Sequence, residues 1–186
     1  MKFAIPLSML PIDEIQSLAV AAEQIGYDSL AVSDHLIHPK TFSVPYPYTA
    51  DGSVRWKAGT DWPDPINTLS LLAGATSTIN FYTSVYVLPA RNPMRAAKEV
   101  ATLSTLSNGR FALGIGMGWM PEEFEAGGQE FSQRGKRADE MIEIMKLLWT
   151  GQMVSFKGQF FKFETLEMLP CPPQDIPIYV GGFSEP

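Results

Sequence analysis

The stretch Arg110-Phe-Ala-Leu-Gly-Ile-Gly-Met-Gly-Trp119 decides the fold, because it contains a short apolar strand that leads directly into a glycine-rich turn. Phe111 to Ile115 has the length and the continuous apolar character of a strand buried on both faces, as in parallel sheets. The glycines at 114, 116 and 118 allow a second backbone or a flat ligand to approach closely. The alternative is that they only ease a crowded strand-to-helix turn. The end of this strand is therefore the first place where we expect chemistry.

Apolar strands and amphipathic helices alternate on both sides of this stretch. The pattern predicts strands that start near residues 2, 29, 79, 110 and 176, the third of them running from Ile79 to Leu88. It predicts helices over 11–26, 65–76 and 93–108, and one that ends at Gly151. The first of these has one apolar face, formed by Ile12, Ile15, Leu18, Ala19, Ala22 and Ile25. Such alternation is typical of a parallel sheet with crossover helices. Where no insertion intervenes, the spacing between successive strand starts is close to the average of roughly 31 residues per unit in a (β/α)8 barrel of about 250 residues.

Two insertions account for the longer spacings. Residues 36–62 are rich in Pro, Tyr and Trp and show no periodicity, whereas residues 154–164 predict a hairpin that turns at Lys157-Gly158. Loops as long as the first insertion are usually functional or disordered, and its aromatic residues argue against disorder. Because it follows a strand, it lies on the face where barrel enzymes place their sites. We expect one domain over residues 1–186.

A doubly wound sheet is the alternative fold. It is disfavoured because the three glycines miss the dinucleotide fingerprint, in which the third glycine stands one position later. In addition, no acidic residue closes a suitable second strand.

Composition excludes several classes of protein. With 45% hydrophobic residues the chain can form a sizeable core, and its net charge of −6 argues against a nucleic-acid partner. No apolar run approaches the roughly 20 residues of a membrane span, and no signal peptide is evident, so we expect a cytoplasmic protein. Cys171 is the single cysteine, which excludes an internal disulfide. A barrel hydrolase or aldolase is disfavoured, because the sequence has no metal-ligand cluster and no lysine clearly placed at a strand end. We therefore predict no metal site.

Several motifs occur in order along nearly the whole chain: Ser33-Asp34-His35, Thr83-Ser84-Val85 with Pro89-Ala-Arg-Asn-Pro93, Gly109 to Trp119 followed by Glu122-Glu123-Phe124, and Ile178-Tyr-Val-Gly-Gly182. As a set they resemble the bacterial luciferase-like oxidoreductases, which are flavin- or deazaflavin-dependent (β/α)8 barrels. The resemblance is closest to the branch that uses coenzyme F-420, and relatives that use FMN share most of these motifs. It implies hydride transfer between coenzyme F-420 and a small organic substrate, or an FMN-dependent monooxygenase that uses oxygen. We also expect a homodimer.

The resemblance places the end of the chain just after strand five of eight. An open five-stranded sheet exposes two edges and the inner face of an unclosed barrel. We therefore expect a fragment or a truncated gene product. A shortened family member closed by a partner chain, and a non-catalytic flavin-binding half-barrel, remain alternatives.

The resemblance also assigns residue roles on the first three strands. His35 matches a histidine beside the reactive face of the cofactor, where it donates a proton or stabilises charge on the ring. Asp34 is expected to orient it. The alternative for His35 is a hydrogen-bonded residue that ends a strand. Ser84 and Val85 match a place where the family often has a non-proline cis peptide, forming a bulge behind the ring; an ordinary trans strand is the alternative.

Further roles follow for the last two strands and the long loop. Met117 and Gly118 match residues that line the ring pocket. Relatives that oxidise sugar phosphates carry a catalytic glutamate where this chain has Trp119, so their mechanism and substrate are in doubt here. We expect Glu122 and Glu123 to form a solvated first helical turn. Gly181, Gly182 and Ser184 match residues that contact the ribityl and phosphate groups of the cofactor. The aromatic residues of the long loop are candidates for a substrate lid, namely Tyr46, Tyr48, Trp56 and Trp62. Surface packing or a dimer contact is the alternative for these four residues.

Overall fold

A computed structural model describes residues 1–182, and its centre is a six-stranded parallel sheet. The strands are β1 (Ala4–Pro6), β2 (Ser29–Val32), β3 (Asn80–Thr83), β4 (Tyr86–Val87), β5 (Phe111–Gly116) and β8 (Ile178–Gly181). β1 pairs with β2, β2 with β3, β3 and β4 with β5, and β5 with β8. Strand order in space therefore follows chain order, as in a barrel, whereas a doubly wound sheet reverses it.

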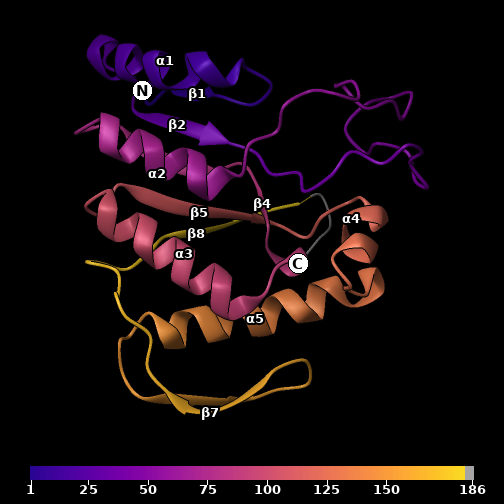
Figure 1. The fold of residues 1–186 in the computed structure, drawn as a ribbon, viewed down its shortest axis with the longest axis vertical. Coiled ribbons are helices and arrows are strands. Elements are labelled where there is room, and N and C mark those ends of the chain that lie inside the picture. Colours follow the sequence, from indigo (N-terminus) through magenta and orange to yellow (C-terminus); the bar gives the residue numbers. More distant parts are fainter. Residues whose placement is uncertain (183–186) are drawn as a thin grey trace.

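Helices follow the strands and cover one face of the sheet (Figure 1). They are α1 (Ile12–Ile25), α2 (Pro65–Ala75), α3 (Pro93–Leu106), α4 (Pro121–Ala126) and α5 (Arg134–Leu148), with 3-10 turns η1 (Leu88–Ala90) and η2 (Phe131–Gln133). The helix starts agree with their sequences. Asp64 and Asn92 each accept two backbone N–H bonds in the first turn, and a proline follows each of them.

The core lies between the sheet and these helices. Leu30, Phe81 and Phe111 stand in register on β2, β3 and β5, and all three are buried. The predicted apolar face of α1 is correct for its middle, where Ile15, Ala19 and Ala22 are buried. It is wrong for the helix ends, because Ile12 and Ile25 are 52% and 75% exposed.

The predicted strand over residues 79–88 is interrupted. β3 ends at Thr83, the Ser84–Val85 peptide bond is cis, and β4 resumes the pairing with β5. Tyr82 faces Ala112 and Tyr86 faces Ile115, so four steps on one strand match three on the other. The extra residue is a bulge. The cis peptide predicted at Ser84–Val85 is confirmed.

The glycines of β5 make room for this bulge. A Cβ on Gly114 would lie 2.0 Å from the Thr83 carbonyl oxygen, and one on Gly116 would lie 2.4 Å from Val85 Cγ2. Thr83 Oγ1 also bonds to the Gly114 carbonyl at 2.7 Å. Close approach of a second backbone is thus the reason for the glycine at 114, as one of the two alternatives predicted, whereas the glycine at 116 makes room for the Val85 side chain.

Gly114→Ala is therefore expected to destabilise the protein. The methyl group has no room, so the free energy of unfolding should fall by about 1 to 3 kcal/mol, measured by urea denaturation. Gly74→Ala is the matched control, because a Cβ there meets nothing within 4 Å on the exposed side of α2. That control should gain about 0.5 to 1 kcal/mol from helix propensity. Equal stability of the two variants would contradict the packing described here.

Both insertions occupy their predicted places. β6 (Val154–Lys157) and β7 (Lys162–Leu166) form the hairpin, which extends two residues further than predicted. Residues 36–62 contain turns and bends but no helix or strand. The segment after β5 contains α4, in whose first turn Glu122 and Glu123 lie, as predicted.

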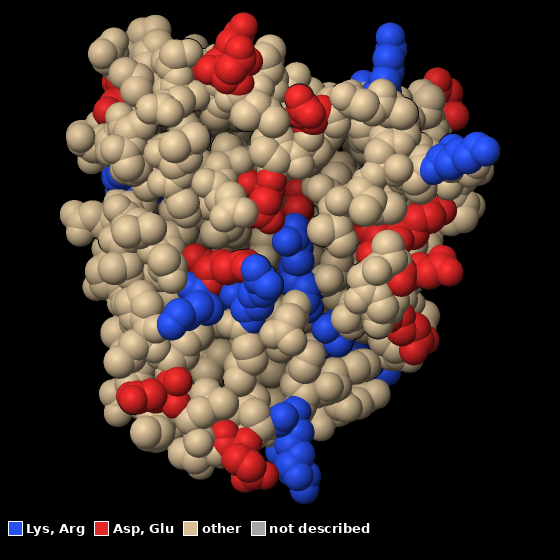
Figure 2. Space-filling model, in the orientation of Figure 1, with Lys and Arg blue, Asp and Glu red and all other residues tan. Residues whose placement is uncertain are grey.

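The sheet is open within the described residues, where β1 pairs only with β2 and β8 only with β5. Side chains at these two edges are exposed, including Phe3, Tyr179 and Val180. On the face drawn in Figure 2, basic and acidic side chains are interspersed and no broad basic surface forms. Among residues 1–182, no helix is both long and apolar enough to cross a membrane.

Glu23 on α1 holds the loop before β3. Its Oε1 accepts the backbone N–H groups of Thr78, Ile79 and Ser77 at 2.6, 2.9 and 2.8 Å. The bonds from Thr78 and Ile79 are the main reason that the pKa of Glu23 falls from 4.5 to about 2. A carboxyl group with a lowered folded-state pKa contributes stability above its unfolded pKa and loses it as the pH falls through the folded value.

Glu23→Gln should therefore be less stable than the wild type at pH 7, and this difference should shrink as the pH falls from about 4.5 towards 2. Urea denaturation across this range measures it. Glu14→Gln, which changes an exposed carboxylate on the same helix, is the control and should track the wild type. A Glu23→Gln difference that stays constant with pH would refute the role of the ionised carboxylate.

Candidate active site

A single cleft gathers the predicted site residues at the carboxyl ends of the strands. Its volume is about 1610 Å³, and its lining includes Asp34 and His35 after β2, Ser84 and Val85 between β3 and β4, Met117 and Gly118 after β5, and Gly181 and Gly182 at the end of β8. Ser184 lies outside the described residues. Tertiary structure thus brings together residues that are up to about 150 positions apart in the chain, as expected for a site at the carboxyl edge of a parallel sheet.

His35 is held on one side by a carboxylate. Its Nδ1 lies 3.0 Å from Glu123 Oε1, and its side chain is only 12% exposed. The rings of Trp56 and Trp62 lie 4.7 and 4.8 Å from the imidazole, centre to centre. The imidazole therefore has one polar partner and otherwise aromatic neighbours, an environment that limits both its rotation and its contact with water.

Glu123 is the functional candidate that sequence reasoning missed. It was predicted to be solvated, but it is 1% exposed, and its Oε1 also accepts the Leu36 backbone N–H at 2.7 Å. Its Oε2 is buried without a hydrogen-bond partner among the described residues. A signal was present, because Glu123 stands in the first helical turn after the β5 turn and hence at the same edge of the sheet as His35.

Glu122 behaves differently from its neighbour. Its Oε1 accepts the Ser43 backbone N–H at 2.6 Å in the long loop. Burial raises the pKa of Glu122, but hydrogen bonds from Ser43 and from the backbone of Glu122 itself together outweigh burial, so the net pKa shift is downward. The two carboxylates of α4 therefore fix two points of the loop over residues 36–62. Only Glu123 reaches the imidazole.

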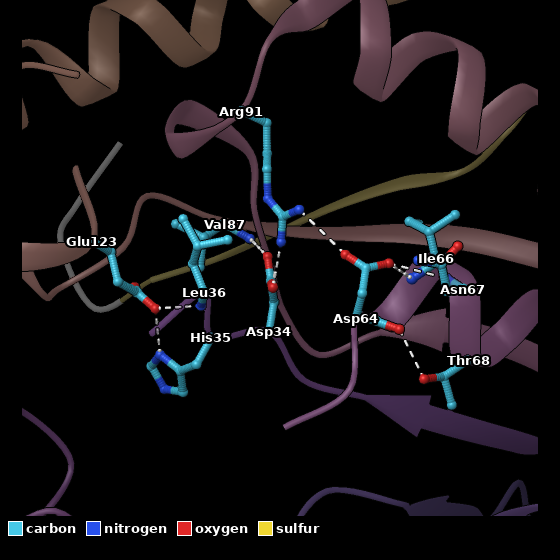
Figure 3. Close-up of polar contacts among 10 residues, drawn as sticks. All are labelled: Asp34, His35, Leu36, Asp64, Ile66, Asn67, Thr68, Val87, Arg91 and Glu123. Atoms are coloured by element: carbon cyan, nitrogen blue, oxygen red, sulfur yellow. Dashed lines mark hydrogen bonds and ion pairs between the residues drawn. The ribbon is translucent and has the colours of Figure 1, made fainter. Parts of the chain in front are cut away.

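Among residues 1–182 the Asp34 carboxylate makes no hydrogen bond to the His35 imidazole, and the carboxylate bonded to that ring is Glu123. The Asp34 carboxylate accepts Arg91 Nη2 at 2.6 Å and the Val87 N–H at 2.9 Å (Figure 3). Arg91 Nη1 also donates to Asp64 at 3.2 Å. Burial raises the pKa of Asp34, while the charge of Arg91 and the bond from Val87 oppose the shift. Asp34 therefore holds β4 and the start of α3, and through them the bulge, in place.

The aromatic residues of the long loop gather around the imidazole. Tyr46 lies 5.5 Å from Trp56 and 5.1 Å from Trp119, and Trp56 and Trp62 lie 5.0 Å apart, all between ring centres. Tyr48 stands 5.1 Å from Tyr46 at the cleft. The four predicted lid residues thus do line the cleft, and Trp119 joins them from the end of β5.

Where a cofactor ring is predicted to bind, the cleft is lined by glycines rather than by aromatic side chains. Gly181 packs against Val85, where an added Cβ would lie 3.1 Å from Cγ1, whereas a Cβ on Gly182 meets nothing within 4 Å. Ser84, Val85 and Met117 line the same cleft. A surface of glycine backbone and short side chains suits a flat ring, so these residues fit a flavin or deazaflavin.

Two longer proteins have sequences similar to this chain. An uncharacterised protein of Mycobacterium tuberculosis is 36% identical over 185 residues, and the match covers all of this chain and 64% of that protein. An F420-dependent glucose-6-phosphate dehydrogenase of Amycolatopsis mediterranei is 32% identical over 173 residues, which cover 91% of this chain and 47% of the relative. The chain therefore spans between about half and two thirds of the length of these relatives.

A solved structure shows the same fold. The oxygenating constituent of 3,6-diketocamphane monooxygenase from Pseudomonas putida, in complex with FMN, superposes with a TM-score of 0.77 at 22% identity, covering 99% of this chain and 52% of that one. The open parallel sheet described above is accordingly a partial TIM barrel of the luciferase-like type, as predicted. A family model described as luciferase-like monooxygenase matches residues 3–186. Fold, strand order and sequence agree, and the chain belongs to the luciferase-like monooxygenase family.

Proposed function

We propose that this chain carries the ring-binding and proton-transfer half of an oxidoreductase that moves a hydride between coenzyme F-420 and a small organic substrate. The observation that carries the proposal is the single cleft in which a glycine-rich surface and the Glu123-bonded imidazole of His35 meet. The 32% identical relative named as F420-dependent favours this coenzyme. When bound, the deazaflavin ring supplies the hydride chemistry.

The residues of the chain bind and orient the ring in this proposal. Ser84, Val85 and Met117 would lie against it, and the amides of Gly181 and Gly182 would face its ribityl and phosphate groups. His35 would hold or deliver the proton at the substrate oxygen through Nε2. Trp56 and Trp62 would exclude water from that proton transfer.

An FMN-dependent monooxygenase is the second candidate, because the fold is also that of a solved monooxygenase with FMN. A homodimer and a cytoplasmic location stay predictions from the sequence and do not affect the choice between the two cofactors.

Titration of the purified chain with coenzyme F-420 and with FMN, followed by absorbance and fluorescence, tests the proposal. Saturable one-to-one binding of F-420 supports it, whereas binding of FMN alone favours the monooxygenase. Binding with no turnover of any hydroxyl compound would favour a non-catalytic half-barrel. If neither cofactor binds, the chain does not carry a working ring site.

A further inference from the structure

The imidazole of His35 has one nitrogen engaged and one available. Nδ1 is bonded to Glu123, and Nε2 has no hydrogen-bond partner among the described residues. Figure 3 shows the bonded edge of the ring turned towards Glu123 and the rest of the ring directed away from it. Because His35 lines the cleft, Nε2 is the atom that a ligand there can meet.

Glu123 determines which ring nitrogen carries the hydrogen. Its Oε1 already accepts a bond from the Leu36 N–H at 2.7 Å, so this oxygen acts as an acceptor towards the backbone. The same oxygen can bond to Nδ1 only if Nδ1 is the donor. A neutral His35 must then carry its hydrogen on Nδ1 and its lone pair on Nε2.

The carboxylate is itself fixed, which distinguishes this pair from a casual contact. Glu123 is 1% exposed and is anchored by the backbone bond to Leu36, the residue next to His35. Asp34, the other buried carboxylate near the histidine, is engaged by Arg91 and Val87. Trp56 and Trp62 confine the imidazole from other directions.

We propose that Glu123 is a positioning residue that holds His35 in the Nδ1-protonated tautomer and so presents its Nε2 lone pair to the cleft. In the reaction proposed above, His35 Nε2 would accept a hydroxyl proton from the substrate, and a bound coenzyme would supply the acceptor for the hydride, so that the two electrons lost by the substrate would be gained by the coenzyme. This proposal rests on the function proposed above.

The first test is the tautomer of His35, read by ¹⁵N NMR without any cofactor. The imidazole signals can be assigned because the chain has only two histidines, so the signals that remain in the His38→Ala variant belong to His35. At about pH 8.5, two units above the ordinary histidine pKa of about 6.5, the neutral ring dominates in a free histidine. The wild type should show a protonated Nδ1 and an unprotonated Nε2.

Variants at position 123 separate the carboxylate from its charge. Glu123→Ala should shift His35 towards the Nε2-protonated tautomer that free histidine prefers. Glu123→Gln should keep the wild-type tautomer, because its amide oxygen still accepts from Nδ1. Glu125→Ala is the matched control on the same helix, since Glu125 is exposed and holds neither His35 nor the loop over residues 36–62, and it should leave the spectrum unchanged.

The second test is steady-state oxidation of 2-propanol and of glucose 6-phosphate as probe alcohols with F-420. Glu123→Ala should lower kcat by about 10²- to 10⁴-fold with little change in KM, by analogy with loss of the carboxylate that orients a catalytic histidine. Glu125→Ala should retain the wild-type kcat. The double variant His35→Ala with Glu123→Ala should be no slower than His35→Ala, because the two residues act as one unit.

Two results would overturn the proposal: an Nε2-protonated His35 in the wild type, or a Glu123→Ala spectrum identical to that of the wild type. If Glu123→Ala does not fold, the spectra of the wild type and of Glu123→Gln still decide. Failure of the proposed function is recognised separately, because it appears as an absence of cofactor binding and leaves the tautomer untouched.

Discussion

His35→Ala is expected to lower kcat/KM by about 10²- to 10⁴-fold, the usual contribution of a positioned general acid or base. The reason is that the variant removes the one ionisable side chain that the cleft holds between a buried carboxylate and two indole rings. Cofactor affinity should change far less, because the ring is assigned to Ser84, Val85 and the glycine surface. Steady-state kinetics and a parallel cofactor titration measure the two effects.

His38→Ala is the matched control for this prediction. His38 lies three residues further along, is exposed, and bonds through Nδ1 only to the Pro39 carbonyl at 3.0 Å. It should keep wild-type kinetics. His35→Asn, which leaves a smaller cavity, guards against a loss caused by unfolding. If His35→Ala is as fast as the wild type, His35 has no part in the mechanism. Such a result would not contradict the fold or the proposed binding surface for the ring.

Asp34→Asn is expected to lower the free energy of unfolding by about 3 to 5 kcal/mol, the cost of breaking a buried ion pair by removing one partner. The Asp34 side chain is 2% exposed and that of Arg91 is 18% exposed, so the remaining guanidinium cannot be fully rehydrated. For a chain of this size the loss corresponds to a fall in Tm of roughly 6 to 20 °C. Thermal and urea denaturation measure it.

Two further variants control this second prediction. Asp64→Asn weakens the other bond of Arg91, but its side chain is 32% exposed and asparagine still caps α2, so the loss should stay below about 1 kcal/mol. Adding Arg91→Met to Asp34→Asn should recover part of the stability, because no charge is then left buried alone. A loss under 1 kcal/mol for Asp34→Asn would mean that the pair does not organise this edge of the sheet.

Local patterns in the sequence were sufficient for most of the fold. The apolar run at 111–115 and the cap at Asn92-Pro93 depend on neighbours within a few residues, which is why both predictions agree with the structure. The interruption of the third strand was not visible in its apolar pattern, since apolar or aromatic residues stand on both sides of the bulge, at Phe81 and Tyr82 before it and from Tyr86 to Leu88 after it. Only the motif at Ser84-Val85 indicated it, through the family resemblance.

The sequence by itself determined the parallel sheet, the chain order of its strands and the edge at which the site lies, because strand ends and helix caps are local features. Only the tertiary structure decided which charged groups meet there. Glu123 reaches His35 across 88 positions and Arg91 reaches Asp34 across 57. Such pairs depend on how α4 and the start of α3 pack at the sheet edge. A buried carboxylate and a solvated one look the same in sequence, as Glu123 and the exposed Glu125 on the same helix illustrate.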